Sequence, residues 1–186
     1  HVLCEKPAVL KKAQAEELYS LAKENNVVFM EAVKTAYCPG FHAMMAAAKS
    51  GKIGRIIDVE AALSRLTPVN TREYMAQDYN GSFLEFGSYV CMPVFELLGC
   101  DYDDVRFHSM RAVNGVDAYT KAVFSFGGKS AEVKTGLGVK TEGQLLISGT
   151  NGYILAKSPW WLTKEFEIRY EDPNKKEVYK YAYEGS

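Results

Sequence analysis

The hydrophobic period changes along this chain, from helical spacing in the first half to strand-like alternation in the second. After Gly99 many residues are β-branched or aromatic, and turn signals such as Asn114-Gly115 and Asn151-Gly152 separate them. Helices grouped before a run of strands indicate an α+β fold, with a large, open, predominantly antiparallel sheet and helices on one face. The predicted strands lie near residues 103–112, 116–126, 129–138, 143–149, 153–157, 162–170 and 177–183.

Helices and one long strand are predicted before Gly99. Apolar residues recur at helical spacing over residues 9–24, from Pro39 to Gly51, and in the segment after Gly81. From residue 55 to residue 66, apolar and polar residues alternate, which predicts a half-exposed strand. Residues 67–80 are polar and predict a loop that a substrate could meet.

Short apolar runs lie on both sides of the first helix. Val2-Leu3-Cys4 and residues 27–30 have the character of buried strands, so strand, helix and strand follow one another as in a crossover unit. The chain opens on His1 rather than Met, inside the first of these runs, so we expect a further segment upstream. Residues 1–36 therefore represent the tail of an α/β domain, and residues 37–186 a sheet domain.

Composition excludes several classes of function. The chain of 186 residues suits one sizeable core, and its net charge of -1 gives no electrostatic reason to expect nucleic acid or a polybasic membrane contact. No apolar run is long enough to cross a bilayer and no signal peptide opens the chain, so we expect a cytoplasmic protein. The cysteines and histidines form neither a Cys-x-x-Cys pair nor zinc-ligand spacing, so we expect no metal and reduced, mostly buried thiols. These residues are Cys4, Cys38, Cys91 and Cys100 with His1, His42 and His108.

The first candidate for chemistry is Glu5-Lys6-Pro7, which comes directly after a predicted strand and before a helix. Functional groups of α/β folds gather at this position, at the carboxyl ends of strands. A Glu-Lys-Pro tripeptide is also common as an ordinary solvated turn, and both readings stay open on the residues alone.

The second candidate is the pair Glu85 and Tyr89 in the predicted helix after Gly81. Residues four apart lie side by side on one helix face, where a carboxylate can orient a phenol that exchanges a proton with a substrate hydroxyl. The alternative is an ordinary surface contact in a polar stripe that Ser82 and Glu96 extend.

Taken in order, these segments resemble the glucose-fructose oxidoreductase and inositol dehydrogenase family, Gfo/Idh/MocA, over nearly the whole chain. The resemblance rests on the order and spacing of several short pieces. They are the Val-Leu-Cys-Glu-Lys-Pro opening, Val-Phe-Met-Glu-Ala at 28–32, Lys49-Ser50-Gly51-Lys52-Ile53-Gly54, the helix between Gly81 and Gly99, and the turn Gly149-Thr150-Asn151-Gly152.

The resemblance implies a Rossmann domain that binds NAD or NADP, joined to a sheet domain, with residues 1–36 as the tail of the dinucleotide-binding domain. Lys6 would hydrogen-bond the reacting oxygen of the substrate, and Glu5 and Pro7 would help to shape the cofactor side. Glu85 stands where many members have Asp, and Tyr89 where many have the proton-transferring His. The resemblance thus implies that Lys6, Tyr89 and Glu85 are catalytic and that Glu5, Lys6 and Pro7 bind the cofactor.

The implied function is hydride transfer to or from a CH–OH group of a sugar, polyol or related cyclic alcohol. No Gly-x-Gly-x-x-Gly element follows a strand in these 186 residues, so we expect the fragment itself to be inactive. Met92, three residues after Tyr89, also stands where the family often has Asp. With these departures at Glu85 and Met92, the alternative function is a non-catalytic binding or dimerisation module of the same fold. An unrelated α+β ligand-binding domain is a third reading, in which the ordered resemblance is accidental.

Aromatic residues suggest two further roles. Trp160 and Trp161 either stack on a sugar or fill the sheet, and packing is the favoured interpretation. Tyr179, Tyr181 and Tyr183 share one strand face. Because the family commonly pairs subunits through its open sheet, we expect a homo-oligomer, such as a dimer, in which this face takes part. Intramolecular cover of the face by a missing terminal segment is the alternative.

Overall fold

The computed structural model describes residues 1–75 and 79–182, and it divides the chain into two compact units, residues 1–34 and residues 35–186. In the first unit, β1 (Val2–Cys4) pairs in parallel with β2 (Phe29–Glu31), and α1 (Lys12–Glu24) connects them. This is the strand, helix and strand order expected from the sequence. The helix begins at Lys12 rather than at residue 9, because the Gln14 side chain accepts hydrogen bonds from the backbone N–H groups of Leu10 and Lys11.

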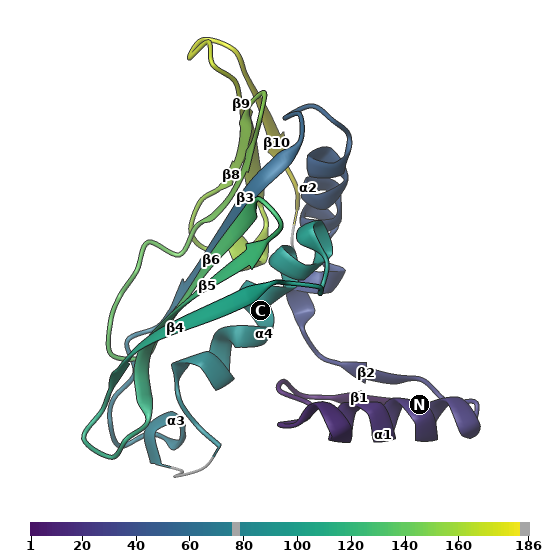
Figure 1. Ribbon diagram of the computed structural model, residues 1–186, viewed down its shortest axis with the longest axis vertical. Coiled ribbons are helices and arrows are strands. Elements are labelled where there is room, and N and C mark those ends of the chain that lie inside the picture. The colour runs from purple at the N-terminus through teal and green to yellow at the C-terminus, as the bar shows by residue number, and fades with distance from the viewer. Residues whose placement is uncertain (76–78, 183–186) are drawn as a thin grey trace. The chain divides into compact units, whose positions relative to one another are not determined.

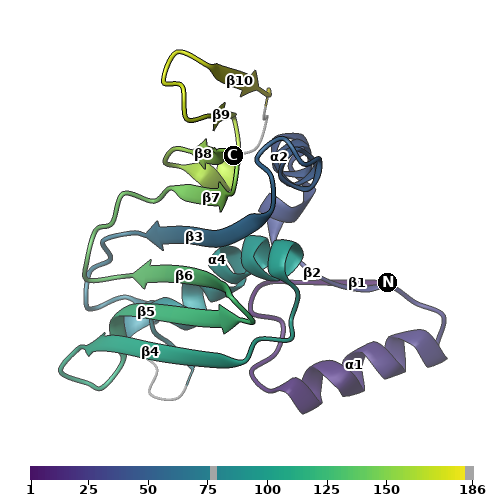
Figure 2. The ribbon, with the colours of Figure 1, turned by 45° about the horizontal axis from the view of Figure 1, so that its top comes forward.

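The second unit is built on an eight-stranded sheet. Figure 2 shows the sheet face-on, with β3 near its centre and β4 and β10 at its edges. Neighbouring strands are antiparallel except β3 and β6, which are parallel, so the predicted open and predominantly antiparallel sheet is confirmed. The spatial order is β10 (Lys176–Lys180), β9 (Glu165–Arg169), β8 (Tyr153–Ala156), β7 (Leu145–Gly149), β3 (Ile56–Ser64), β6 (Lys129–Gly136), β5 (Asp117–Phe126) and β4 (Asp104–Arg111).

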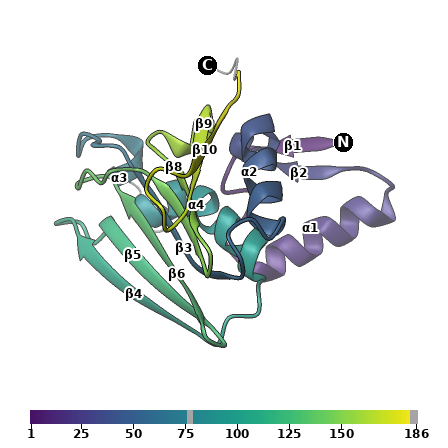
Figure 3. The same cartoon turned by 90° about the horizontal axis from the view of Figure 1, so that it is seen from above.

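Two helices, α2 (Pro39–Lys49) and α4 (Ser82–Leu98), lie on the same face of this sheet (Figures 1 and 3). Side chains from that face form the core, because alternate strand residues such as Val59, Ala122 and Ile154 point toward the helices and are fully buried. Among the described residues no helix covers the opposite face, which is the open face of the sheet.

Local structure differs from the sequence expectation in two connections. The loop predicted over 67–80 contains a short helix, α3 (Arg72–Met75), and its residues 76–78 lie outside the described part of the chain. The strand expected from residue 162 begins at Glu165 instead. The preceding 3-10 turn η2 (Trp160–Leu162) ends at Thr163, whose left-handed backbone (φ 41°) cannot continue a strand.

The strand tyrosines lie on the covered side of the sheet. Tyr179 pairs with Phe166 across β10 and β9, and the two rings stack with centroids 4.8 Å apart. The Tyr181 ring also stacks on Phe166, with centroids 6.1 Å apart. These two rings therefore pack on the core of their own chain. A role in subunit pairing would require them to line the open face, which they do not. Tyr183 lies outside the described residues.

Candidate active site

The Glu5-Lys6-Pro7 segment follows β1 directly in the first unit. Its neighbour Ala8 donates a backbone hydrogen bond of 3.1 Å to the carboxylate of Glu31, the last residue of β2. Lys6 and Glu31 therefore both lie at the carboxyl end of a parallel strand pair, where α/β folds place ligand-binding groups. Sequence reasoning did not single out Glu31, although its place at the end of a buried run carries that signal.

Glu85 and Tyr89 lie one turn apart on α4, and both side chains are half-buried. The predicted stripe is wrong in one member, because Ser82 is fully buried and points into the sheet. Glu96 is exposed and pairs instead with Lys49 of α2, with 3.1 Å between Nζ and Oε1. The polar face of α4 that remains is the Glu85 and Tyr89 pair, which the structure brings together.

The N-terminus of α4 is fixed by a strand residue. The Asp117 carboxylate of β5 accepts a hydrogen bond of 3.0 Å from the backbone N–H of Phe83, in the first turn of the helix. Gly81 before the helix has φ 126°, and a Cβ there would lie 1.8 Å from Asp117 Oδ1. Only glycine fits at position 81, because any side chain there would collide with the Asp117 carboxylate that holds the first turn of α4.

Arg65 comes directly after β3 and lies beside α4. Its guanidinium is 5.9 Å from the ring centroid of Phe86 and makes a 3.1 Å ion pair with Glu73 of α3. A hydrogen bond from its own backbone N–H, with the Arg65 charge in support, holds the pKa of the Glu73 carboxyl below its usual value. Sequence reasoning missed both residues, because Arg65 and Glu73 meet only through the fold of residues 66–72.

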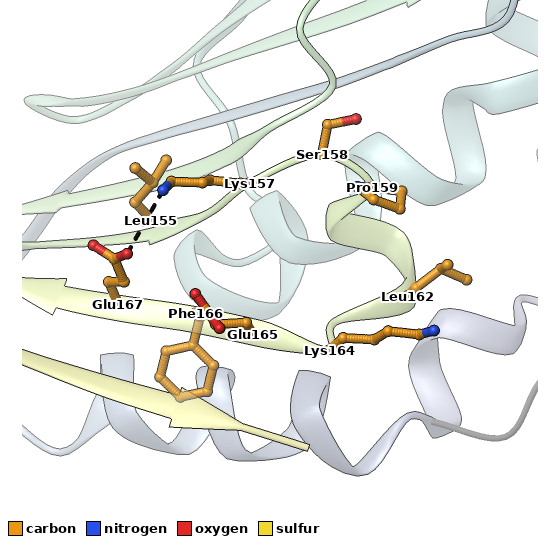
Figure 4. A pocket seen from close by; sticks show the side chains of 9 residues that line it. All are labelled: Leu155, Lys157, Ser158, Pro159, Leu162, Lys164, Glu165, Phe166 and Glu167. Atoms are coloured by element: carbon orange, nitrogen blue, oxygen red, sulfur yellow. Dashed lines mark ion pairs between the residues drawn. The ribbon is translucent and has the colours of Figure 1, made fainter. Parts of the chain in front are cut away.

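A separate cavity of about 230 Å³ is lined by residues from the end of β8, the 3-10 turn η2 and the start of β9 (Figure 4). Lys157 and Glu167 face each other across it, 3.7 Å apart. Arg169 donates hydrogen bonds to Glu167 and thereby lowers the pKa of that carboxyl. None of the site residues predicted from the sequence lines this cavity, so it is distinct from the candidate site on α4.

The two tryptophans have packing roles. Trp160 is 1% exposed, and its indole N–H donates a 2.8 Å hydrogen bond to the carbonyl of Ala62 on β3. Trp161 packs edge-on against it, with ring centroids 6.4 Å apart. The indole of Trp160 is therefore unable to offer a stacking surface to a sugar, in agreement with the favoured interpretation.

The described residues contain neither a metal-binding cluster nor a membrane-spanning helix. Within residues 1–75 and 79–182, no three His, Cys, Asp or Glu side chains are grouped so that they could hold a metal ion. Over the same residues no helix has both the length and the apolar character to span a bilayer. Burial raises the pKa of the Cys91 thiol on α4 to about 12, so this thiol is protonated at neutral pH. The expectation of mostly buried thiols is wrong, because only Cys38 is fully buried, whereas Cys4 and Cys91 are half-buried and Cys100 is exposed.

Comparison with known proteins gives a consistent set of relatives. Residues 41–155 match the model of the GFO/IDH/MocA C-terminal domain. The chain is 29% identical over 182 residues to scyllo-inositol 2-dehydrogenase (NADP(+)) IolU of Bacillus subtilis, covering 92% of this chain and 54% of that protein. It is 26% identical over 174 residues to trans-1,2-dihydrobenzene-1,2-diol dehydrogenase of Bos taurus, covering 91% and 51%. The chain thus spans about half the length of these relatives.

Solved structures share the fold. The 3-ketoreductase KijD10 of Actinomadura kijaniata, in complex with NADP and TDP-benzene, superposes with a TM-score of 0.80 at 22% identity, over 97% of this chain and 57% of that one. An NAD binding oxidoreductase from Klebsiella pneumoniae gives a TM-score of 0.78 at 17% identity, over 96% and 53%.

Proposed function

Because the chain belongs to the GFO/IDH/MocA family, we propose that the whole protein is an NAD(P)-dependent oxidoreductase acting on a CH–OH group. The substrate class we propose is a sugar, a polyol or a related cyclic alcohol, in keeping with the inositol and dihydrodiol dehydrogenases among its relatives. The observation that carries the proposal is the carboxylate and phenol pair, Glu85 and Tyr89, on one face of α4.

Each proposed catalytic residue has a role that its chemistry suits. Tyr89 exchanges the proton of the substrate hydroxyl, and Glu85, one turn earlier on α4, orients the phenol. Lys6 donates a hydrogen bond to the reacting oxygen and stabilises the negative charge that develops on it. These roles need a phenol, a carboxylate and an ammonium group, and the family resemblance assigns them to these positions.

The cofactor site is only partly contained in this chain. The nicotinamide would supply the hydride acceptor or donor, and Glu5, Lys6 and Pro7 would shape its surroundings at the end of β1. The phosphate-binding glycine turn is not among these 186 residues, so the chain alone does not fit a whole dinucleotide. We accordingly propose that residues 1–36 complete a dinucleotide-binding domain and that residues 37–186 form the substrate and dimerisation domain.

Subunit pairing through the open face of the sheet is part of the proposal. The open face carries charged residues that already pair within the chain, such as Lys121 and Lys134 with Glu132 at 2.5 and 2.6 Å. A surface of alternating, partly buried charges can meet a second copy of itself in an isologous contact. The Tyr179 and Tyr181 rings take no part in this contact, because they stack on Phe166.

A non-catalytic module of the same fold is the second candidate. Glu85 and Met92 stand where many family members have Asp, and these two departures on α4 favour it. The two candidates differ in turnover, which one experiment measures.

The deciding experiment follows cofactor absorbance at 340 nm for the full-length protein with a panel of sugars, polyols and cyclic diols. Turnover that Lys6→Ala and Tyr89→Phe each lower by about 10²-fold or more supports the enzyme and both roles. Tyr102→Phe is the matched control, because that exposed ring packs on Phe95 and Phe124 at the end of the sheet domain. A folded, cofactor-binding protein with no turnover on any substrate would support the non-catalytic module.

A further inference from the structure

A converging set of hydrogen bonds ends on the Asp117 carboxylate beneath the start of α4. Oδ2 of Asp117 accepts from the Ser82 hydroxyl at 2.7 Å, from the Phe83 backbone N–H at 3.0 Å and from the Thr120 hydroxyl at 2.7 Å. Ser82 and Phe83 are the first residues of α4, whereas Thr120 belongs to β5 with Asp117 itself. One carboxylate oxygen therefore ties the first turn of the helix to the sheet.

The direction of the neighbouring hydrogen bonds follows from proton counting. Each hydroxyl has one hydrogen, and Ser82 and Thr120 both give theirs to the carboxylate. Thr135 must then donate to Ser82, at 2.9 Å, and Ser109 must donate to Thr120, also at 2.9 Å. Three of these hydroxyl residues are buried, and the hydrogen bonds from Ser82 and Thr120 end on the Asp117 carboxylate, which therefore orders the network. The Thr135 hydroxyl also lies 3.5 Å from the carbonyl oxygen of Thr120. The buried members are Ser82, Thr120 and Thr135.

The helix start has no alternative cap. Ser82 is already within the helix, and Gly81 has no side chain, so no residue of the helix's own sequence caps Phe83. A negative charge at this end also interacts favourably with the helix dipole. The β4–β5 turn that leads to Asp117 holds the preceding segment as well, through a hydrogen bond from the Asn114 amide to the carbonyl of Tyr74 in α3.

We propose that Asp117 is a positioning residue, which fixes the rotation and height of α4 on the sheet and thereby the placement of Glu85 and Tyr89. Asp117 acts through Ser82 and Phe83 and is not a catalytic residue. Glu85 N–H bonds to the carbonyl of Gly81 at 3.0 Å, so the first turn that Asp117 holds is the turn from which the Glu85 and Tyr89 stripe starts. This inference rests on the proposed function for its kinetic consequence only.

The kinetic test uses the full-length protein and whichever panel substrate is turned over. Asp117→Ala should lower kcat by about 10²-fold, the cost of a misplacement of about 1 Å, with KM for substrate and cofactor within about twofold. Asp117→Asn keeps the shape and one acceptor oxygen and loses the charge, so it should restore kcat to within about fivefold of the wild type. Asp104→Asn is the matched control, because Asp104 pairs with Arg106 of its own exposed strand.

A double-mutant cycle tests the route through Ser82. Ser82→Ala should lower kcat in the wild type and have little further effect in Asp117→Ala, because the hydroxyl has then already lost its partner. Additive effects of the two substitutions, or an Asp117→Ala enzyme with kcat within about threefold of the wild type, would overturn the inference.

Amide exchange separates this inference from the proposed function. In Asp117→Ala the Phe83 amide should exchange at least about tenfold faster, whereas core amides of β6 should be unchanged. If the wild type turns over no substrate, the proposed function fails. The exchange result still decides whether Asp117 holds the first turn of α4 on the sheet. Unchanged exchange at Phe83 would then refute the role of Asp117.

Discussion

At the scale of single residues, a buried hydrogen bond from Trp160 contributes to the stability of the sheet domain. Trp160 fills space in the core, and its indole N–H donates a hydrogen bond to the carbonyl of Ala62. Ala62 belongs to the central strand β3 and lies just beyond the last residue pair of β3 with β7, Ala61 and Leu145. Removal of the donor leaves that buried carbonyl without its partner, which is costly because water cannot replace it. Trp160 therefore contributes to stability through both area and hydrogen bonding.

Trp160→Phe should reduce the free energy of unfolding by about 2 kcal/mol, from the lost hydrogen bond and the cavity that remains. Urea denaturation of the 186-residue chain, followed by far-UV circular dichroism, measures this change. Trp161→Phe is the control and should cost less, because Trp161 is only half-buried. Equal losses for both variants would contradict the role assigned to the Trp160 hydrogen bond.

At the scale of elements, the edge strand β10 is held by a cluster of polar side chains. Lys52, in the turn after α2, donates to Glu177 at 2.5 Å and to the Tyr179 hydroxyl at 2.7 Å. The Tyr170 hydroxyl donates to the other oxygen of Glu177 at 2.7 Å. Hydrogen bonds from Lys52, then from Tyr170 and Tyr179, lower the pKa of Glu177 to about 2, and the same pairing raises the pKa of Lys52.

The cluster predicts a specific pH dependence of stability. The folded pKa of Glu177, about 2, lies below its ordinary value of 4.5, so its contribution is complete above pH 4.5 and is lost as the pH falls toward 2. Glu177→Gln should therefore have a lower urea midpoint than the wild type at pH 7, and the difference should shrink below pH 4.5. Because these side chains are about one-third exposed, the difference should also decrease in high salt.

The control for this experiment is Glu171→Gln, an exposed residue in the turn between β9 and β10. A difference between Glu177→Gln and the wild type that stays constant from pH 7 to pH 3 would contradict the assigned pKa.

At the scale of the whole molecule, the chain contains the core of a folded sheet domain but no Gly-x-Gly-x-x-Gly turn after a strand. The described residues place Lys6 at the end of β1 and Tyr89 on α4, in two units that each have their own contacts. A dinucleotide needs in addition the glycine turn and helix N-terminus that hold its pyrophosphate. The activity proposed for the family member therefore belongs to the full-length protein.

The isolated chain of 186 residues should fold without measurable turnover and without tight binding of NADH or NADPH. Isothermal titration of the purified chain with each nucleotide measures this, and the full-length protein titrated alongside is the positive control. Nanomolar affinity of the isolated chain for either nucleotide would contradict the prediction.

The open face of the sheet leads to a prediction about assembly. Glu132 forms ion pairs with both Lys121 and Lys134 on this face, so Glu132→Lys places three cations together. If copies pair through the open face, this repulsion should convert the full-length dimer to monomer in sedimentation velocity, most strongly at low salt. The control is Glu171→Lys, which makes the same change in net charge at an exposed turn. A Glu132→Lys dimer as stable as the wild type would contradict pairing through the open face.

The hydrophobic period and the turn residues of the sequence by themselves predicted the order of the main helices and strands. They could do so because a two-residue or a 3.6-residue repeat is a local property of the chain. Residues 55–66 were predicted as a strand and the segment between Gly81 and Gly99 as a helix from these patterns, and the family resemblance rested on the same short segments. Glu85 and Tyr89 could be paired for the same reason, since an i,i+4 contact needs only the helix.

Contacts between distant segments were decided only by the tertiary structure. Asp117 gave no signal in the sequence, because its partners Ser82 and Phe83 are more than thirty residues away and meet it only when β5 packs beneath α4. The same applies to Lys52 with Glu177, which are 125 residues apart. Arg65 and Glu73 are only eight residues apart, but they meet through the fold of the loop between them. The side on which Tyr179 lies is a further example, because a strand pattern shows which residues share a face, whereas the packing of other elements decides which face is covered.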